Sequence, residues 1–172
     1  MAETVQEKNG LPADMEQLVS DIEDTLKDMY LTFRLGDEDY AIEIRYVTEI
    51  VGIHKITEVP DMPAHVKGVV NLRGQVIPVI DMRLRFNMIG RSYDERTCII
   101  VINIRERQVG LVVDTVNEVR SIDEMSVSHP PKVGGNHCAQ YIHGLGKVGE
   151  DVKILLNANK LLFEDDFSVN EE

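Results

Sequence analysis

Four side chains in the last third of the chain are of the types that bind zinc. They are His129, His137, Cys138 and His143. Zinc sites place Cys and His ligands at characteristic short spacings, usually in two pairs. The spacing here matches none of these patterns, and the segment is rich in Gly and Pro. We therefore predict no metal and no cofactor.

Residues 144–149 formally satisfy the G-x-G-x-x-G pattern of dinucleotide-binding loops. Such a loop needs a helix directly after it, so that the helix amino terminus faces the pyrophosphate. Residues 152–156 instead have the pattern of a strand, and Val148 follows Gly146-Lys147 where a P-loop needs Ser or Thr. Because no Ser, His or Cys lies in a nucleophile motif, we predict no catalytic residue. A small-ligand or metal enzyme of unknown reaction is kept as the alternative.

A third arrangement points to binding. A short apolar strand ends in Asn71-Leu72-Arg73-Gly74, which places Arg73 at the tip of a tight turn because Gly74 can adopt a positive φ. An Arg at such a tip either stays solvated or pairs with a carboxylate or a partner protein. Both readings stay open on the residues alone.

Composition limits the partners. The 172 residues are enough for one domain or for two small β subdomains that share a core, and the net charge is -12. Nucleic acid and anionic membranes are bound by clustered Lys and Arg, so this charge opposes both. We expect a protein partner or a small solute.

The expected location is the cytoplasm. Residues 1–7 lack the basic and apolar regions of a signal peptide, and no apolar stretch approaches the about 20 residues that cross a bilayer. Cys98 lies in an apolar run and is expected to be a reduced, buried thiol, although a disulfide with Cys138 stays open.

The periodicity of the chain changes after residue 28. Within residues 1–28, apolar residues fall at helical spacing opposite an acidic face, which predicts either a peripheral or partly disordered helix or one that docks a partner. Residues 164–172 form an acidic tail. Between these ends, short Val/Ile-rich segments separated by turn residues predict an all-β fold of small barrels or a sandwich. The segments are residues 30–35, 40–44, 69–72, 75–80, 97–104, 109–113 and 152–156.

An internal repeat refines this prediction. Residues 33–50 align with residues 102–119 at a shift of 69, and residues 68–86 align with residues 144–163 at a shift of 76, with one residue out of step at the end. The order is the same in both halves, which favours two related β subdomains. The Asn-Leu-Arg-Gly turn occurs in one half only, so shared packing does not explain it.

Four ordered segments resemble the CheW family: residues 36–50, 65–81, 109–119 and 141–146. The resemblance runs over residues 29–163 and implies two five-stranded, SH3-like β-barrels packed together, with short helices. It implies binding without catalysis, between the cytoplasmic tip of a chemoreceptor and the regulatory domain of the histidine kinase CheA, in an array at the membrane. The acidic extension gains no function from it. A coupling domain of another chemosensory-type array is the runner-up.

The resemblance also implies which residues bind. An apolar groove for the receptor's helical hairpin is lined or supported by Val47, Ile50, Gly68, Val116 and Val119. Each valine also fits ordinary core packing.

A second implied feature orients the turn. Glu49 and Arg73 match family positions that lie near each other, so we expect an ion pair that ties the turn of Asn71 and Gly74 to the Val-x-Glu-Ile element.

Overall fold

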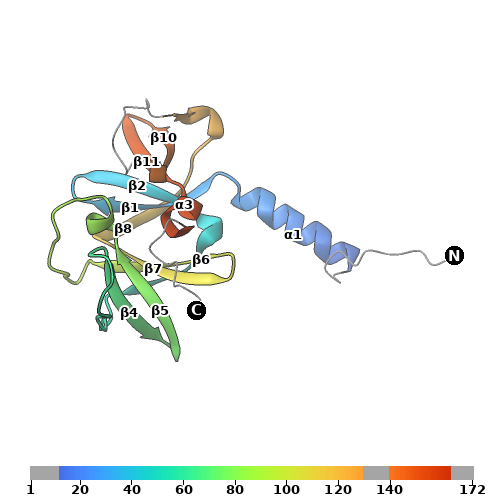
Figure 1. The fold of residues 1–172 in the computed structure, drawn as a ribbon. Helices are drawn as coiled ribbons and strands as arrows, with labels where there is room; N and C mark the ends of the chain where they lie inside the picture. Colours follow the sequence, from blue (N-terminus) through green and yellow to red (C-terminus); the bar gives the residue numbers. More distant parts are fainter. Residues whose placement is uncertain (1–11, 130–139, 164–172) are drawn as a thin grey trace.

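The computed structural model describes residues 12–129 and 140–163 as a mostly β molecule built on two sheets (Figure 1). The first half of the chain contains α1 (Ala13–Leu26), β1 (Met29–Leu35), β2 (Glu38–Glu43), the 3-10 turn η1 (Ile44–Tyr46), β3 (Val47–Gly52), β4 (Val66–Leu72), β5 (Gln75–Asp81) and α2 (Met82–Arg85). The second half contains β6 (Cys98–Ile104), β7 (Arg107–Val113), β8 (Thr115–Ser121), η2 (Glu124–Ser126), β9 (Val127–Ser128), β10 (Ile142–Val148), β11 (Asp151–Leu156) and α3 (Ala158–Phe163).

The two sheets have the same plan. One has the order β8-β1-β2-β11-β10-β9 and the other the order β3-β6-β7-β5-β4. Each contains one parallel contact, β2 with β11 and β5 with β7. The repeat relates them residue by residue. In one sheet Val79 pairs with Gly110. Their equivalents in the repeat, Leu155 at the shift of 76 and Ala41 at the shift of 69, pair in the other sheet. The two predicted subdomains are therefore equivalent in topology.

The subdomains are interlocked, because the strand after each first hairpin joins the other sheet. β3 follows β2 but pairs with β6, and β8 follows β7 but pairs with β1. The chain thus crosses between the sheets twice by this route, once at η1 and once between β7 and β8. These two crossings fix how the units sit against each other.

The prediction of two five-stranded barrels is corrected. The sheets contain six and five strands, and neither closes into a barrel among the described residues. In the five-stranded sheet, the long connection after β3 makes only an isolated bridge, Thr57 with Val69, to β4. In the other sheet, β9 is two residues long and forms the sixth strand. Short, broken pairing at these edges leaves both sheets open.

All seven predicted segments fall in strands, but β3, β8, β9 and β10 are absent from that prediction. β3 alternates half-buried and exposed positions, and β8 is mostly exposed. A strand that packs on one side only lacks the continuous apolar run that marks the others. β3 and β8 nevertheless carry four of the five residues expected to line the groove.

Three clusters of buried side chains hold the molecule together. The largest lies between the sheets and includes Phe33 and Ile42 from one and Ile100 and Leu111 from the other. A second fills the five-stranded unit and a third, around Ile122, fills the six-stranded unit. A shared core with one smaller core on each side is what a sandwich of two half-open barrels requires.

The expected helix in the extension is present, but it buries none of its residues against the described part of the chain. No residue of α1 is buried, and the helix projects from the start of β1 (Figure 1). The division of the chain at residues 28 and 163 stays a prediction, and residues 1–11 and 164–172 lie outside the described part. No helix among the described residues is long and apolar enough to span a membrane.

Cys98 differs from expectation. It is a free, half-buried thiol at the first position of β6, and its Sγ donates to the Arg96 carbonyl at 3.3 Å. The residues that follow it, from Ile99 to Ile102, are the buried ones, because the strand enters the core only beyond its first position. Cys138 lies outside the described residues.

Candidate functional site

The two crossing strands carry four of the five predicted groove residues. Val47 opens β3 and pairs with Ile102, while Val116 lies in β8 and pairs with Phe33. Both valines are half-buried and pack on the shared core. Core packing therefore explains these two positions, and it also shows that β3 and β8 lie over the same cluster of side chains.

The other two positions are different. Ile50 on β3 is 43% exposed and Val119 on β8 is 46% exposed. They are equivalent in the repeat at the shift of 69, and they face Ile100 and Leu31 across their strand pairs. Core packing does not account for a branched apolar side chain left in water at the same place in both halves. Such an exposed pair is a candidate contact for an apolar partner surface.

Gly68 is buried beneath another segment of the chain. Its φ is +141°, and a Cβ built on it would lie 2.0 Å from the carbonyl oxygen of Thr57. Thr57 and Val69 exchange backbone hydrogen bonds of 2.8 and 2.9 Å at this crossing. Gly144, its equivalent at the shift of 76, lies under Ser128 in the same way. A glycine at position 68 lets the two backbones approach this closely.

Glu49 and Arg73 are paired. Nη2 of Arg73 donates to Oε1 of Glu49 at 2.5 Å, and the hydrogen bond raises the pKa of Arg73. The Arg73 side chain is 77% exposed and that of Glu49 is 25% exposed. In the other half, Glu118 stands at the position of Glu49 and pairs with Arg120 on its own strand.

The turn that carries Arg73 is shaped by its neighbours. Oδ1 of Asn71 accepts from the backbone N–H of Gly74 at 2.9 Å, and Arg73 and Gly74 both have positive φ, +52° and +82°. The equivalent of Arg73 in the other half is Gly149, with φ +60°. An arginine at a position that suits glycine costs backbone energy, and such positions often have a functional reason.

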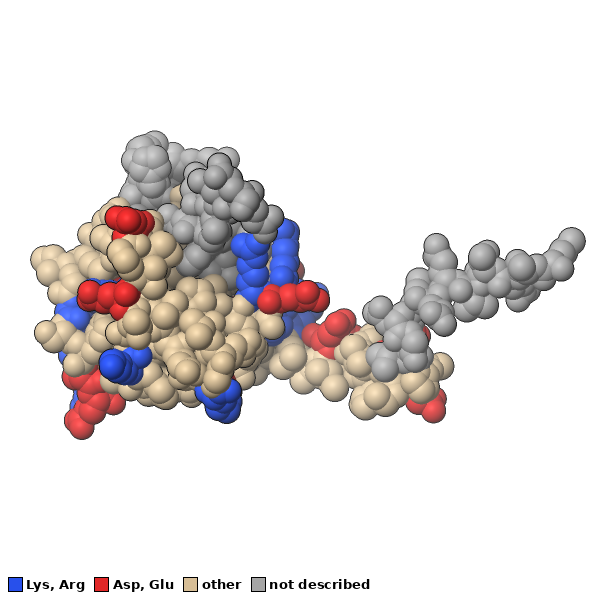
Figure 2. Space-filling model, turned by 60° about the horizontal axis from the view of Figure 1, so that its bottom comes forward, with Lys and Arg blue, Asp and Glu red and all other residues tan. Residues whose placement is uncertain are grey.

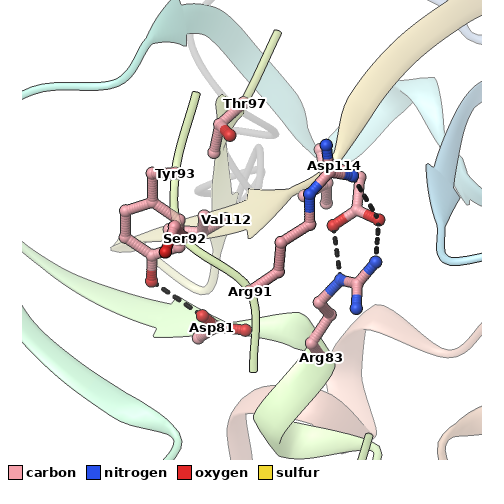
Figure 3. Close-up of a pocket in the computed structure, with 9 residues that line it drawn as sticks. Asp81, Arg83, Arg91, Ser92, Tyr93, Thr97, Val112 and Asp114 are labelled. Atoms are coloured by element: carbon pink, nitrogen blue, oxygen red, sulfur yellow. Dashed lines mark hydrogen bonds and ion pairs between the residues drawn. The ribbon is translucent and has the colours of Figure 1, made fainter. Parts of the chain in front are cut away.

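A polar cluster that sequence reasoning missed lies beside α2 (Figure 3). Arg83 faces the carboxylate of Asp114 with Nε–Oδ1 and Nη2–Oδ2 distances of 2.7 and 2.5 Å, and the Tyr93 hydroxyl donates to Asp81 at 2.7 Å. Burial alone would raise the pKa of Asp114, but hydrogen bonds from Arg83 and from the Gly36 N–H outweigh it and hold that pKa below its usual value. The repeat offered the one available signal, because Asp114 in the second half is equivalent to Arg45 in the first half, and the two residues differ in charge.

This cluster is not suited to hold a substrate. Its cavity measures about 10 Å³, room for roughly one water. The carboxylates of Asp81 and Asp114 are engaged by Tyr93 and Arg83, so they are already satisfied within the protein. The arrangement favours a structural role over an enzyme site.

The sharper chemical motifs gain no support from the described part of the chain. No group of three His, Cys, Asp or Glu there is arranged to hold a metal ion. His129 and His143 stack edge to face with centroids 6.4 Å apart, while His137 and Cys138 lie outside the described residues. Residues 144–149 run along β10 into a turn before β11, with no helix amino terminus at the glycines.

Charge is unevenly spread. The five charged residues of α1 are all acidic, whereas Lys and Arg side chains are interspersed with acids over the body of the molecule (Figure 2).

Comparisons with known proteins agree on one family. A family model described as the CheW-like domain matches residues 29–165. The chain is 39% identical over 146 residues to a chemotaxis protein CheW of Klebsiella aerogenes, covering 85% of this chain and 88% of that protein. It is 34% identical over 135 residues to the CheW of Treponema pallidum, covering 76% and 79%. The crystal structure of the scaffolding protein TtCheW from Thermoanaerobacter tengcongensis superposes with a TM-score of 0.70 at 34% identity, covering 76% and 84%.

Proposed function

Because the chain belongs to the CheW family of chemotaxis scaffold proteins, we propose that it couples chemoreceptors to the histidine kinase CheA by binding both. The family acts in signal transduction as a non-enzymatic scaffold, so the activity to be explained is recognition. The proposed site of action is the cytoplasmic face of a receptor array.

The receptor is proposed to bind across β3 and β8. The observation that supports this best is the exposure of Ile50 and Val119 at equivalent places on the two crossing strands, whose Val47 and Val116 pack on one shared core. Helical partners are held by grooves in which branched side chains contact an apolar helix face. Val47 and Val116, which pack on the shared core, are proposed to form the base of this groove, with Gly68 on β4 as its support.

The Glu49–Arg73 pair is proposed to orient the rim of this groove. Glu49 precedes Ile50 on β3, so the pair ties the Asn71–Gly74 turn to the strand that carries the proposed receptor contact. The exposed guanidinium of Arg73 also remains available to a partner.

The kinase regulatory domain is proposed to pack on apolar surface at the end of one subdomain. Each contact within an array can be weak, because many linked contacts act together through a high effective concentration.

The experiment measures binding of the purified receptor tip and of the CheA regulatory domain, separately and together. Changing Ile50 or Val119 to Ser should weaken receptor binding by about tenfold or more, as expected for a central apolar contact. The matched control is Val76→Ser, which removes a 63% exposed valine from β5. Melting temperatures should stay unchanged in all three variants, since none of these side chains is buried. Equal receptor affinity in the variants and the control would contradict the groove, and no binding by the wild-type protein would contradict the function.

A further inference from the structure

We propose that Asp114 is a positioning residue, which locks β8 against the five-stranded unit and so sets the spacing of the two strands that bind the receptor. The role of the spacing rests on the proposed function, whereas the lock itself can be measured in the free protein. Asp114 was absent from every candidate site predicted from sequence.

Asp114 lies at the second crossing between the two sheets. It is the one residue between β7 and β8, where the chain leaves the five-stranded sheet and enters the six-stranded sheet. Its backbone N–H donates to the Arg34 carbonyl at 3.1 Å, so the crossing is already tied to β1. Because β8 pairs with β1 and β3 pairs with β6, a change here in how the two units meet would move Val116 and Val119 relative to β3.

The contacts of its carboxylate come from both units. Oδ2 accepts from the N–H of Gly36 at 2.8 Å, in the β1–β2 turn of the six-stranded unit. Both carboxylate oxygens accept from Arg83, which belongs to α2 after β5 of the five-stranded unit (Figure 3). The two side chains are only 11% and 16% exposed, so solvent weakens the pair little. One carboxylate thereby connects the two units at the crossing.

Arg83 is itself held in place. Its Nη1 donates to the carbonyl of Ile89 at 3.1 Å, on the connection between α2 and β6. Arg91 of the same connection approaches Oδ2 of Asp114 at 3.8 Å. A planar guanidinium held by several hydrogen bonds fixes both the orientation and the distance of the carboxylate that it binds, whereas a single mobile charge fixes neither.

Among the residues that the structure describes, the other crossing has no such lock. Arg45 stands in η1 at the position equivalent to Asp114, and its exposed guanidinium pairs with Glu43 two residues away at 2.5 Å. Asn159 stands at the position equivalent to Arg83 and reaches the Tyr46 hydroxyl at 3.3 Å. The same topology therefore forms at this crossing without a buried ion pair between units. What the pair adds at the β7–β8 crossing is a defined placement of β8.

Placement of β8 matters because a receptor helix must contact β3 and β8 at once. If β8 samples several positions, only a fraction of the molecules presents both strands at the right spacing, and the measured affinity falls by that fraction. The affinity for a partner that contacts only one subdomain should stay unchanged.

The test compares Asp114→Asn with Asp81→Asn. Asn at position 114 keeps an oxygen for Gly36 but loses the paired contact with Arg83. Asp81 lies in the same cluster, yet within the described part of the chain its carboxylate bonds only to the Leu84 N–H and the Tyr93 hydroxyl, both in the five-stranded unit. Asn at position 81 keeps an oxygen for the Leu84 N–H at the start of α2, and the change removes no direct contact of Asp114 with Gly36 or Arg83.

Two measurements are made on each protein at matched folded fraction. The first measurement is the distribution of distances between two spin labels, recorded by electron paramagnetic resonance. The labels are attached at Gly52→Cys on β3 and Ser121→Cys on β8, and both native cysteines are replaced by Ala. A Cβ at Gly52 meets no atom within 4 Å, so the label has room there. Affinities for the receptor tip and for the kinase regulatory domain are measured in parallel.

For Asp114→Asn we expect a broadened or shifted distance distribution and receptor binding weakened about tenfold, within the range of typical coupling free energies. Kinase binding should stay within about twofold, and Asp81→Asn should match the wild type in both measurements. Asp114→Glu, which keeps the charge, should restore part of the receptor affinity. If Asp114→Asn does not fold, Arg83→Lys takes its place, since it keeps the charge but not the paired geometry.

An unchanged distance distribution would overturn the lock. An equal loss of receptor and kinase binding would reduce the pair to a stabilising contact and overturn its positioning role. A changed distribution in a protein whose wild type does not bind receptor would instead count against the proposed function alone.

Discussion

An ion pair between Arg73 and Glu49 joins the two edges of the five-stranded sheet. Glu49 lies on the edge strand β3, and Arg73 lies in the turn that follows β4 at the opposite edge, yet Nη2 and Oε1 are 2.5 Å apart. The open sheet is therefore curved enough to bring its edges together, and an exposed ion pair spans the gap that strand pairing leaves.

Exchanging this pair tests its role. Glu49→Arg and Arg73→Glu should each weaken receptor binding and signalling, because like charges then face each other across the edges. The double exchange should restore both, while the melting temperature changes little throughout, since an exposed pair contributes little to folding. A double variant no better than either single variant would show that the pair is not what matters.

The two buried glycines of the repeat should differ in their tolerance. Gly68→Ala combines a positive φ with a Cβ only 2.0 Å from a backbone oxygen, whereas the nearest atom to a Cβ at Gly144 is a Val127 methyl at 2.6 Å. We expect Gly68→Ala to lower the free energy of unfolding by about 2–4 kcal/mol and Gly144→Ala by less. Urea unfolding of both variants checks the order, and the reverse order would contradict it.

A buried ion pair in one unit corresponds to an uncharged pair in the other. Nζ of Lys153 donates to Asp39 at 2.6 Å, while Ile77 and Gln108 stand at the equivalent positions. Lys153→Ile alone should cost about 1–3 kcal/mol, because it leaves Asp39 without its main partner.

The double change Lys153→Ile with Asp39→Gln copies the other unit. It should return the free energy of unfolding to within about 1 kcal/mol of the wild type, since replacing both members of a buried pair is often neutral. Urea unfolding of the single and double variants decides this, and additive losses would show that the charges themselves are needed.

Acid should remove the contribution of Asp114. Its pKa in the folded protein lies below the value of about 3.9 in an unfolded chain. The carboxylate therefore stabilises the fold fully above about pH 4, and the effect is lost as the pH falls through the lower, folded-state pKa. At pH 7, Asp114→Asn should cost about 2–3 kcal/mol, and the difference from wild type should narrow below about pH 4. A difference that is constant from pH 7 to pH 3 would contradict the assignment.

Removal of residues 1–27 should leave folding unaffected. α1 has no buried residue, and its apolar side chains Met15, Leu18 and Ile22 are all exposed. We expect an unchanged midpoint of urea unfolding, with binding of receptor and kinase measured in the same preparation. A clearly lower midpoint would mean that the extension packs on the domain in solution.

Local pattern was enough for much of the fold. Runs such as residues 97–104 and 109–113 are mostly apolar strands flanked by turn residues. The two shifts of the repeat correctly made Val79 equivalent to Leu155 and Gly110 equivalent to Ala41, because each pair of strands has the same register. β3 and β8 escaped because their exposed side chains break the apolar pattern. The exposure that hid these strands is also what makes Ile50 and Val119 candidates for binding.

Strand content, the internal repeat and the turn around Arg73 were all readable in the printed residues, because alternation and turn formation act between neighbours along the chain. The exchange of β3 and β8 between sheets, the open edges and the Asp114–Arg83 lock were not. They depend on contacts between segments 31 or more residues apart, whose free energy comes from burying one shared core. A local pattern carries no record of which distant surface completes that core.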